Sequence, residues 1–80
     1  MSVHAPTRPL WTCAGCSAAW PCASRRQQLL AQYPHDLLPA ALYLAACLVE
    51  AAYDLPDVPA GELYRRFLGW LPDRPFRARE

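Results

Sequence analysis

Apolar side chains recur three and four residues apart over most of residues 23–71, and this period predicts three helices joined by short connections. The first helix is expected over residues 24–33, because Ser24 and Gln27 form a capping-box pattern and Pro34 stops the run. No segment alternates between apolar and polar residues as a half-buried strand does. The pattern therefore favours an all-α fold.

Two further helices follow, and each begins with residues that favour a helix start. The second is expected from Asp36, as its N-cap, to about Asp54, with Pro39 tolerated in its first turn. The third is expected from about Pro59, a first-turn proline, to near Leu71. Another proline follows each of these segments closely, and proline disfavours continuation of a helix.

The middle helix is unusual because it is apolar almost all round. Two apolar stripes run along it: Leu38, Leu42, Ala45, Val49 and Ala52 form one, and Leu37, Leu44, Leu48 and Leu55 form the other. Two short neighbouring helices are too small to cover both stripes. We therefore expect this helix to be covered by the N-terminal segment or by a second chain, which would be a protein partner or another copy.

The residues outside the helices differ between the two ends of the chain. Residues 1–22 hold three prolines, two tryptophans and three of the four cysteines without a helical or strand period, whereas residues 72–80 form a polar tail. Eighty residues make one small domain, whose core is marginal without an added staple. We expect a single domain over residues 1–80, in which an irregular, metal-stapled segment (1–22) packs on a small three-helix bundle (23–71).

Three cysteines lie close together in the N-terminal segment with the spacing of metal ligands. Cys13 and Cys16 form a Cys-x-x-Cys pair, and Gly15 between them suits a tight turn that needs a positive φ. Cys22 follows close to the start of the first helix, where the helix dipole favours a thiolate over a thiol. These three cysteines are therefore expected to bind one metal ion, for which zinc is the first choice.

The fourth ligand has three candidates. His4 lies ahead of Cys13 across two prolines, so its segment could loop back over the ion, and we place it first. His35 lies in the turn after the first helix, about 15 Å from Cys22 along a helix of this length. Cys47 lies in the middle of the second helix, where a small buried hydrophobe is the simpler interpretation.

The motif Trp-x-Cys-x-x-Cys-x-x-x-Trp-Pro-Cys over residues 11–22 resembles that of a group of small proteins from high-GC bacteria. The resemblance covers most of the chain and implies that His4 belongs with the cysteines. It implies no established activity. Some of these proteins carry a flavin reductase label, but this chain is far smaller than a flavin-binding barrel and has no glycine-rich loop for phosphate.

The spacing Cys-x-x-Cys-x5-Cys is also similar to the last three cysteines of the WhiB-like iron–sulfur regulators. In that family a fourth, upstream cysteine completes a [4Fe–4S] site. This chain has no cysteine before Cys13, and it lacks both the Gly-Val-Trp-Gly-Gly turn and the basic tail of the family. His4 would have to complete the set, and a histidine ligand suits zinc better.

The charge and hydropathy of the chain argue against several kinds of partner. The net charge is +1 at pH 7, which offers no electrostatic footprint for nucleic acid or an anionic membrane. The longest uncharged stretch, residues 37–49, is shorter than the roughly 20 residues of a membrane span. The opening residues lack the pattern of a signal peptide, so we expect a cytoplasmic protein, in which clustered cysteines bind metal or act in redox chemistry.

These features predict a small zinc-binding helical protein that works by protein–protein contact, as an accessory subunit or regulator. Four protein ligands fill a tetrahedral shell, so the metal is expected to be structural. We find no catalytic constellation and expect no enzyme, because the carboxylates near the last two helices fit caps and solvated surface. The alternative is an iron–sulfur or thiol redox sensor that uses the same cysteines.

Overall fold

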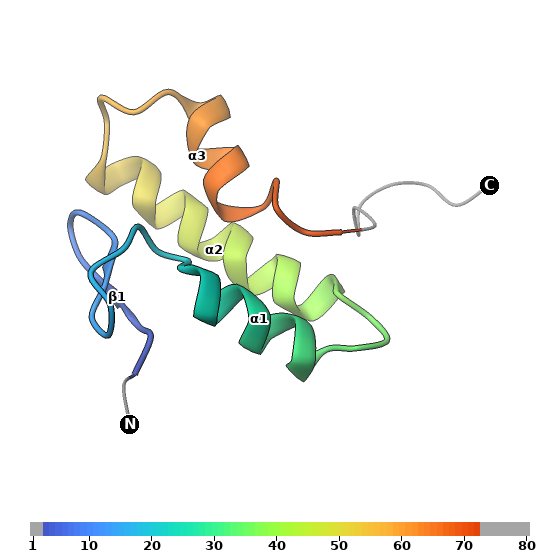
Figure 1. Cartoon of the computed structure of the whole chain (residues 1–80). Coiled ribbons are helices and arrows are strands. Elements are labelled where there is room, and N and C mark those ends of the chain that lie inside the picture. The colour runs from blue at the N-terminus through green and yellow to red at the C-terminus, as the bar shows by residue number, and fades with distance from the viewer. Residues whose placement is uncertain (1–2, 73–80) are drawn as a thin grey trace.

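The computed structural model describes residues 3–72, which form three helices and one small two-stranded sheet (Figure 1). The elements, in chain order, are β1 (Pro6–Thr7), β2 (Thr12–Cys13), α1 (Ala23–Gln32), α2 (Leu38–Asp54) and α3 (Ala60–Phe67). The polar tail expected over residues 72–80 lies outside the described residues apart from Pro72. The described chain is thus mostly helical, as expected, but it is not all-α.

The N-terminal segment is not irregular but forms a short hairpin. β1 and β2 pair antiparallel, with Pro6 opposite Cys13 and Thr7 opposite Thr12. A further isolated bridge joins Thr12 to Ala19, so the chain folds back on itself a second time. The expectation of an irregular segment was wrong because two-residue strands are too short to show the alternation by which a strand is recognised.

The starts of α1 and α2 and the end of α3 differ from the expected positions. Cys22, not Ser24, is the N-cap of α1, and it makes no side-chain cap bond, so the predicted capping box does not form. The carboxylate of Asp36 accepts a hydrogen bond from the N–H of Leu38 at 3.0 Å, although Leu37 is the N-cap residue. α3 ends at Phe67, four residues before the expected end at Leu71.

α2 is the central element, and α1 and α3 lie along two of its sides (Figure 1). It buries small side chains, Ala40, Ala41 and Ala51, together with Leu44. Alanines let a neighbouring helix approach closely, and α3 packs its buried Leu63 and Phe67 here. α1 reaches the same core chiefly through Leu29, the one fully buried residue of that helix.

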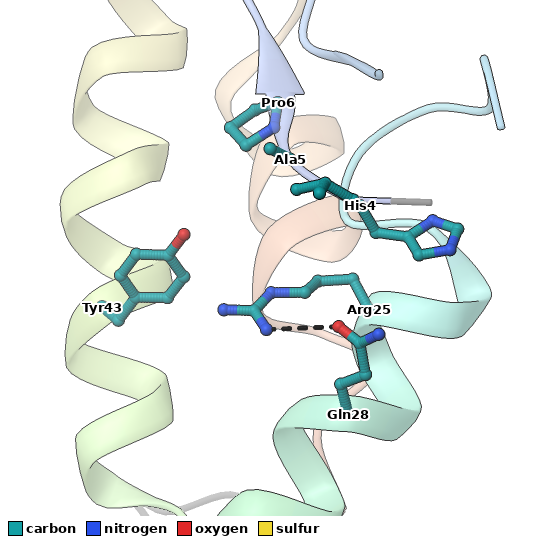
Figure 2. A pocket seen from close by; sticks show the side chains of 7 residues that line it. His4, Ala5, Pro6, Arg25, Gln28 and Tyr43 are labelled. Carbon is teal, nitrogen blue, oxygen red and sulfur yellow. Dashed lines mark hydrogen bonds between the residues drawn. The ribbon is translucent and has the colours of Figure 1, made fainter. Parts of the chain in front are cut away.

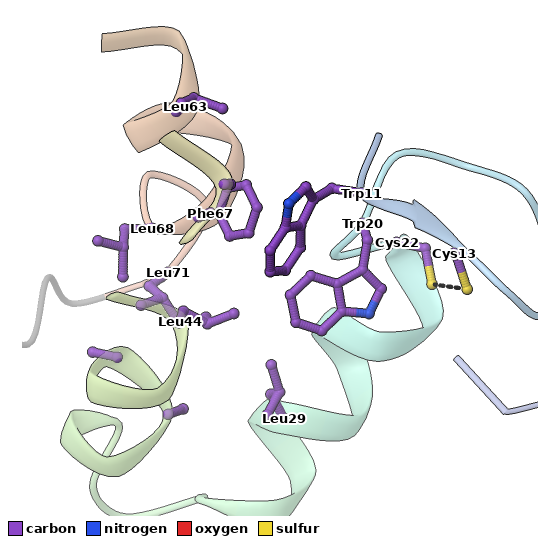
Figure 3. Packing of buried hydrophobic residues seen from close by; sticks show 13 residues of the cluster. Trp11, Cys13, Trp20, Cys22, Leu29, Leu44, Leu63, Phe67, Leu68 and Leu71 are labelled. Atoms are coloured by element: carbon purple, nitrogen blue, oxygen red, sulfur yellow. Dashed lines mark hydrogen bonds between the residues drawn. The ribbon is translucent and has the colours of Figure 1, made fainter. Parts of the chain in front are cut away.

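Two tryptophans connect the hairpin to this helical core (Figure 3). Trp20 has no exposed surface and Trp11 almost none. The Trp11 ring meets Phe67 edge-on at 5.6 Å between centroids, and the Trp20 ring lies 6.0 Å from both other rings. Such aromatic clusters dominate the burial of a small core, so both tryptophans serve to pack the hairpin on the helices.

Asp54, at the end of α2, holds the hairpin from the other side. Its carboxylate accepts hydrogen bonds from Arg8 Nε at 2.6 Å and from Trp11 Nε1 at 2.9 Å. These bonds hold the pKa of Asp54 below its usual value, and the bond from Arg8 has the larger effect. Arg8 also pairs with Glu50 at 3.2 Å, so both acidic residues of α2 are engaged by the hairpin.

Arg66 on α3 binds the backbone of the N-terminal segment directly. Its Nε donates to the carbonyl oxygen of Trp20 at 2.9 Å, and its Nη2 donates to the carbonyl oxygen of Trp11. Arg26 on α1 adds to this arrangement by donating to the carbonyl oxygens of Pro21 at 3.0 Å and Arg66 at 3.3 Å. The two arginines therefore satisfy carbonyl groups that the packed tryptophans remove from water.

One face of α2 remains exposed. Leu42 and Val49 keep 58% and 57% of their surface exposed, and Leu38 keeps 40%. The hairpin therefore covers only part of the helix, and the first of the two apolar stripes stays exposed except at Ala45, which is half-buried against the core. Even so, no helix within residues 3–72 combines the length and apolar character needed to cross a membrane.

We expect the Arg66→Ala variant to be less stable than the parent by about 1–3 kcal/mol, because the Trp20 carbonyl group loses its side-chain donor and the Trp11 carbonyl group keeps only the backbone N–H of Trp20. For a chain of this size that loss lowers the melting temperature by roughly 5–15 °C. Thermal unfolding followed by circular dichroism measures the change. Arg65→Ala is the matched control, since Arg65 is exposed on the same helix. Equal melting temperatures of the two variants would show that the hydrogen bonds of Arg66 do not stabilise the fold.

Candidate metal centre

Four soft donor atoms converge at the base of the hairpin. The imidazole of His4 and the sulfur atoms of Cys13, Cys16 and Cys22 all lie within 4.8 Å of one another. They come from the segment before β1, the end of β2, the turn after β2 and the N-cap of α1. Such a set of three thiols and one imidazole lies within metal-binding distance, as the cysteine spacing predicted.

Three of these donors are separated by distances close to those around a single ion. His4 Nδ1 lies 3.2 Å from Cys13 Sγ and 3.3 Å from Cys22 Sγ, and the two sulfur atoms lie 3.6 Å apart. A tetrahedral zinc ion, with Zn–S near 2.3 Å and Zn–N near 2.0–2.1 Å, would separate its ligands by about 3.5–3.8 Å. A disulfide would need about 2.05 Å, and all four cysteines are free thiols.

The Cys13–Cys16 turn is built so that backbone N–H groups face sulfur. The turn closes with a hydrogen bond from the N–H of Ser17 to the carbonyl oxygen of Cys13 at 2.8 Å. Within it, the N–H of Gly15 donates to Cys13 Sγ at 3.3 Å. Ser17 has the positive φ, 65°, that brings the chain back toward Ala19.

These contacts change the acidity of the thiols. Burial raises the pKa of Cys13, but donation from the N–H groups of Gly15 and Cys16 and from His4 outweighs it and lowers that pKa to about 6. The pKa of Cys16 is raised: a hydrogen bond from Ala18 lowers it, but burial and the neighbouring thiols Cys13 and Cys22 prevail. Cys13 therefore loses its proton readily, and its negative charge disfavours the loss of a proton from Cys16. A bound cation would offset the repulsion between the two thiolates.

Gly15 lacks a side chain where the backbone of Val3 approaches it closely, and it does not have a positive φ. We expected a positive φ, but none of the described glycines has one. A Cβ at Gly15 would lie 2.7 Å from the carbonyl oxygen of Val3 and 3.3 Å from His4 Nδ1. The absent side chain thus leaves room for the segment that brings His4 to the cysteines.

His4 is held in place from its backbone as well. Trp20 Nε1 donates to the carbonyl oxygen of His4 at 3.2 Å, so the buried indole positions the histidine while it packs in the core. In Figure 2 the His4 imidazole points away from Tyr43 and from the shallow pocket of about 340 Å³ that the same segment lines. The ring is thereby directed to the cysteines.

Neither other candidate for the fourth ligand joins the cluster. His35 lies in the exposed turn between α1 and α2. Cys47 lies half-buried on α2 among hydrophobic neighbours, and burial raises its pKa. The choice of His4 over these two agrees with the geometry.

One side of the donor cluster is buried in the protein, and the other side is exposed to solvent. Cys13 and Cys22 are buried, and their sulfur atoms meet against α1 (Figure 3), whereas His4 is half-buried and Cys16 is exposed. Sequence reasoning missed Arg66, whose guanidinium group binds the carbonyl groups of Trp20 and Trp11. Nothing in its local pattern indicates that it binds carbonyl groups far away in the chain.

Comparison with protein-family models, with curated proteins and with solved structures finds no match. The site is therefore interpreted from its own geometry.

We expect Gly15→Ala to weaken binding of Zn²⁺ by roughly tenfold to a hundredfold, as changes just outside a set of metal ligands commonly do. The added methyl group would push the Val3–His4 segment away from the sulfur atoms. Competition with a chromogenic chelator measures the affinity. Gly61→Ala is the control, because a Cβ there has only Arg65 Nη1 within contact, at 3.9 Å, and an unchanged affinity in Gly15→Ala would contradict the close-approach argument.

Proposed function

We propose that this chain is a zinc-stapled helical module that acts by protein–protein contact, as an accessory subunit or regulator. His4, Cys13, Cys16 and Cys22 hold one structural zinc ion. The observation that carries the proposal is the convergence of these donors, from four separate positions, within 4.8 Å. Bound zinc would supply no reaction, but it would tie the hairpin to the start of α1.

A structural role for the metal follows from the donor count. Three thiolates and one imidazole complete a tetrahedral shell and leave no position for a reactive water. The acidic residues nearest the hairpin are already occupied, since Arg8 binds both Asp54 and Glu50. The chain is therefore proposed to be a binding module and not an enzyme.

The spacing of the sulfur atoms favours a single ion over an iron–sulfur cluster. In a [4Fe–4S] cluster each iron takes its own ligand, which spreads the ligands around the cube, whereas Cys13 and Cys22 approach to 3.6 Å. The redox alternative keeps one supporting feature, the exposed sulfur of Cys16. Brown protein with visible absorbance after anaerobic purification would favour that alternative.

The first experiment measures metal content and its link to stability. We expect native mass spectrometry and elemental analysis to find one zinc per chain in colourless protein. Cys16→Ser should lower the melting temperature by about 10 °C or more, because metal-binding free energy is also folding free energy in such modules. Cys16 is exposed, so its loss disturbs no packing, and Cys47→Ser is the control thiol outside the cluster. A Cys16→Ser protein that melts like the parent would refute the staple.

The second experiment tests the fourth ligand. We expect His4→Ala to retain zinc at least about tenfold less tightly than the parent, because the imidazole is replaced by water or by nothing. His35→Ala should bind zinc as the parent does, since His35 lies outside the cluster. Equal retention in the two variants would remove His4 from the site and leave only the three cysteines.

A further inference from the structure

A pocket of about 340 Å³ lies between the start of the hairpin, α1 and α2 (Figure 2). α1 lines it with Arg25 and Gln28, α2 lines it with Tyr43, and the chain before and at the start of β1 lines it with residues 3–6. Its volume falls at the lower end of the about 300–1,000 Å³ that is usual for small-molecule sites. The imidazole of His4 points away from this pocket, so the pocket is a space apart from the four metal donors.

The two polar side chains that α1 contributes present hydrogen-bond donors to this pocket. Arg25 Nη1 donates to the side-chain oxygen of Gln28 at 3.3 Å. This bond engages the acceptor of Gln28 and leaves its amide N–H groups, together with the other N–H groups of the guanidinium. The guanidinium carbon also lies 5.8 Å from the centre of the Tyr43 ring. The positive charge is therefore held between α1 and α2 by a hydrogen bond and by an aromatic face.

The acceptors nearest to this charge are already engaged elsewhere. The carbonyl oxygen of His4 accepts a hydrogen bond from Trp20 Nε1 at 3.2 Å, and that of Ala5 accepts one from the N–H of Ala14 at 2.8 Å. No carboxylate lines the pocket, and within residues 3–72 no carboxylate forms an ion pair with Arg25. A lining with one unpaired cation, further donors and no acid favours a bound anion.

The chemistry of the lining also indicates which kind of anion fits. A guanidinium group offers a planar fork of N–H donors that matches the two oxygens of a carboxylate. Its single charge balances one carboxylate, whereas a phosphate dianion would keep a charge in excess. Val3, Ala5 and Pro6 add apolar surface beside this polar end. We propose that the pocket binds a small organic carboxylate, with its charged group on Arg25 and Gln28 and its apolar body against residues 3–6.

The test is a titration of the protein as purified, followed by nuclear magnetic resonance, with benzoate as the probe. We expect benzoate to bind with a Kd on the order of 1 mM, as suits a ligand of so few atoms. Acetate has the charge without the ring, and benzyl alcohol has the ring without the charge. Each of these two should bind at least about tenfold more weakly, because each makes only part of the contacts.

Two variants change the charge of the pocket at positions of similar size. Arg25→Gln removes the cation, and Gln28→Glu places a carboxylate beside the guanidinium, where it occupies the site from within the chain. Both should weaken benzoate binding by at least about tenfold, the usual worth of a charge-assisted hydrogen bond. Gln27→Glu is the matched control, because Gln27 is exposed on the same helix outside the pocket, and its Kd should equal that of the parent.

Several results would overturn the proposal. They are no binding of benzoate at tenfold the expected Kd, equal binding of benzyl alcohol, tighter binding of phenyl phosphate than of benzoate, or parent-like binding in Arg25→Gln. Helicity measured on every variant separates loss of the site from loss of the fold, and Gln28 is exposed, so Gln28→Glu disturbs no packing. Zinc content measured on the same samples tests the proposed function separately, and zinc-bound protein that ignores benzoate would leave the zinc-stapled module standing.

Discussion

The structure depends on the meeting of His4 with three cysteines. Their donor atoms come together although they arise from four positions in a segment whose two strands have only two residues each. A hairpin of that size has little backbone pairing and little surface to bury. The donor cluster is therefore placed to provide a cross-link that regular structure of this length cannot, and the proposed zinc ion would supply it with few residues.

Around that cluster, a second set of contacts fixes the hairpin on the helices. Trp20 serves both sets, since its ring packs beside Phe67 while its indole N–H holds the carbonyl oxygen of His4. Arg66 binds the backbone on either side of the cysteine turn. A disturbance of the donor cluster is thereby transmitted to the core of the helices, so the site and the fold are expected to be lost together.

Spacing within short segments was a sound guide to this chain. The three cysteines and the end of α2 follow from local pattern, and the resemblance and reach of His4 indicated the fourth donor. The missed features depend on contacts between distant segments. Gly15 accommodates Val3, and Arg66 finds its carbonyl acceptors across the molecule. No local pattern encodes such contacts.

The reach of Arg66 has a consequence for how the chain is made. Its hydrogen bonds to Trp20 and Trp11 span 46 and 55 residues. During synthesis on the ribosome the cysteine hairpin emerges well before the helix that completes it, and contacts of such long sequence separation form late. The nascent hairpin must therefore wait with its thiols and indoles unprotected, and early capture of a metal ion would shelter it through that interval.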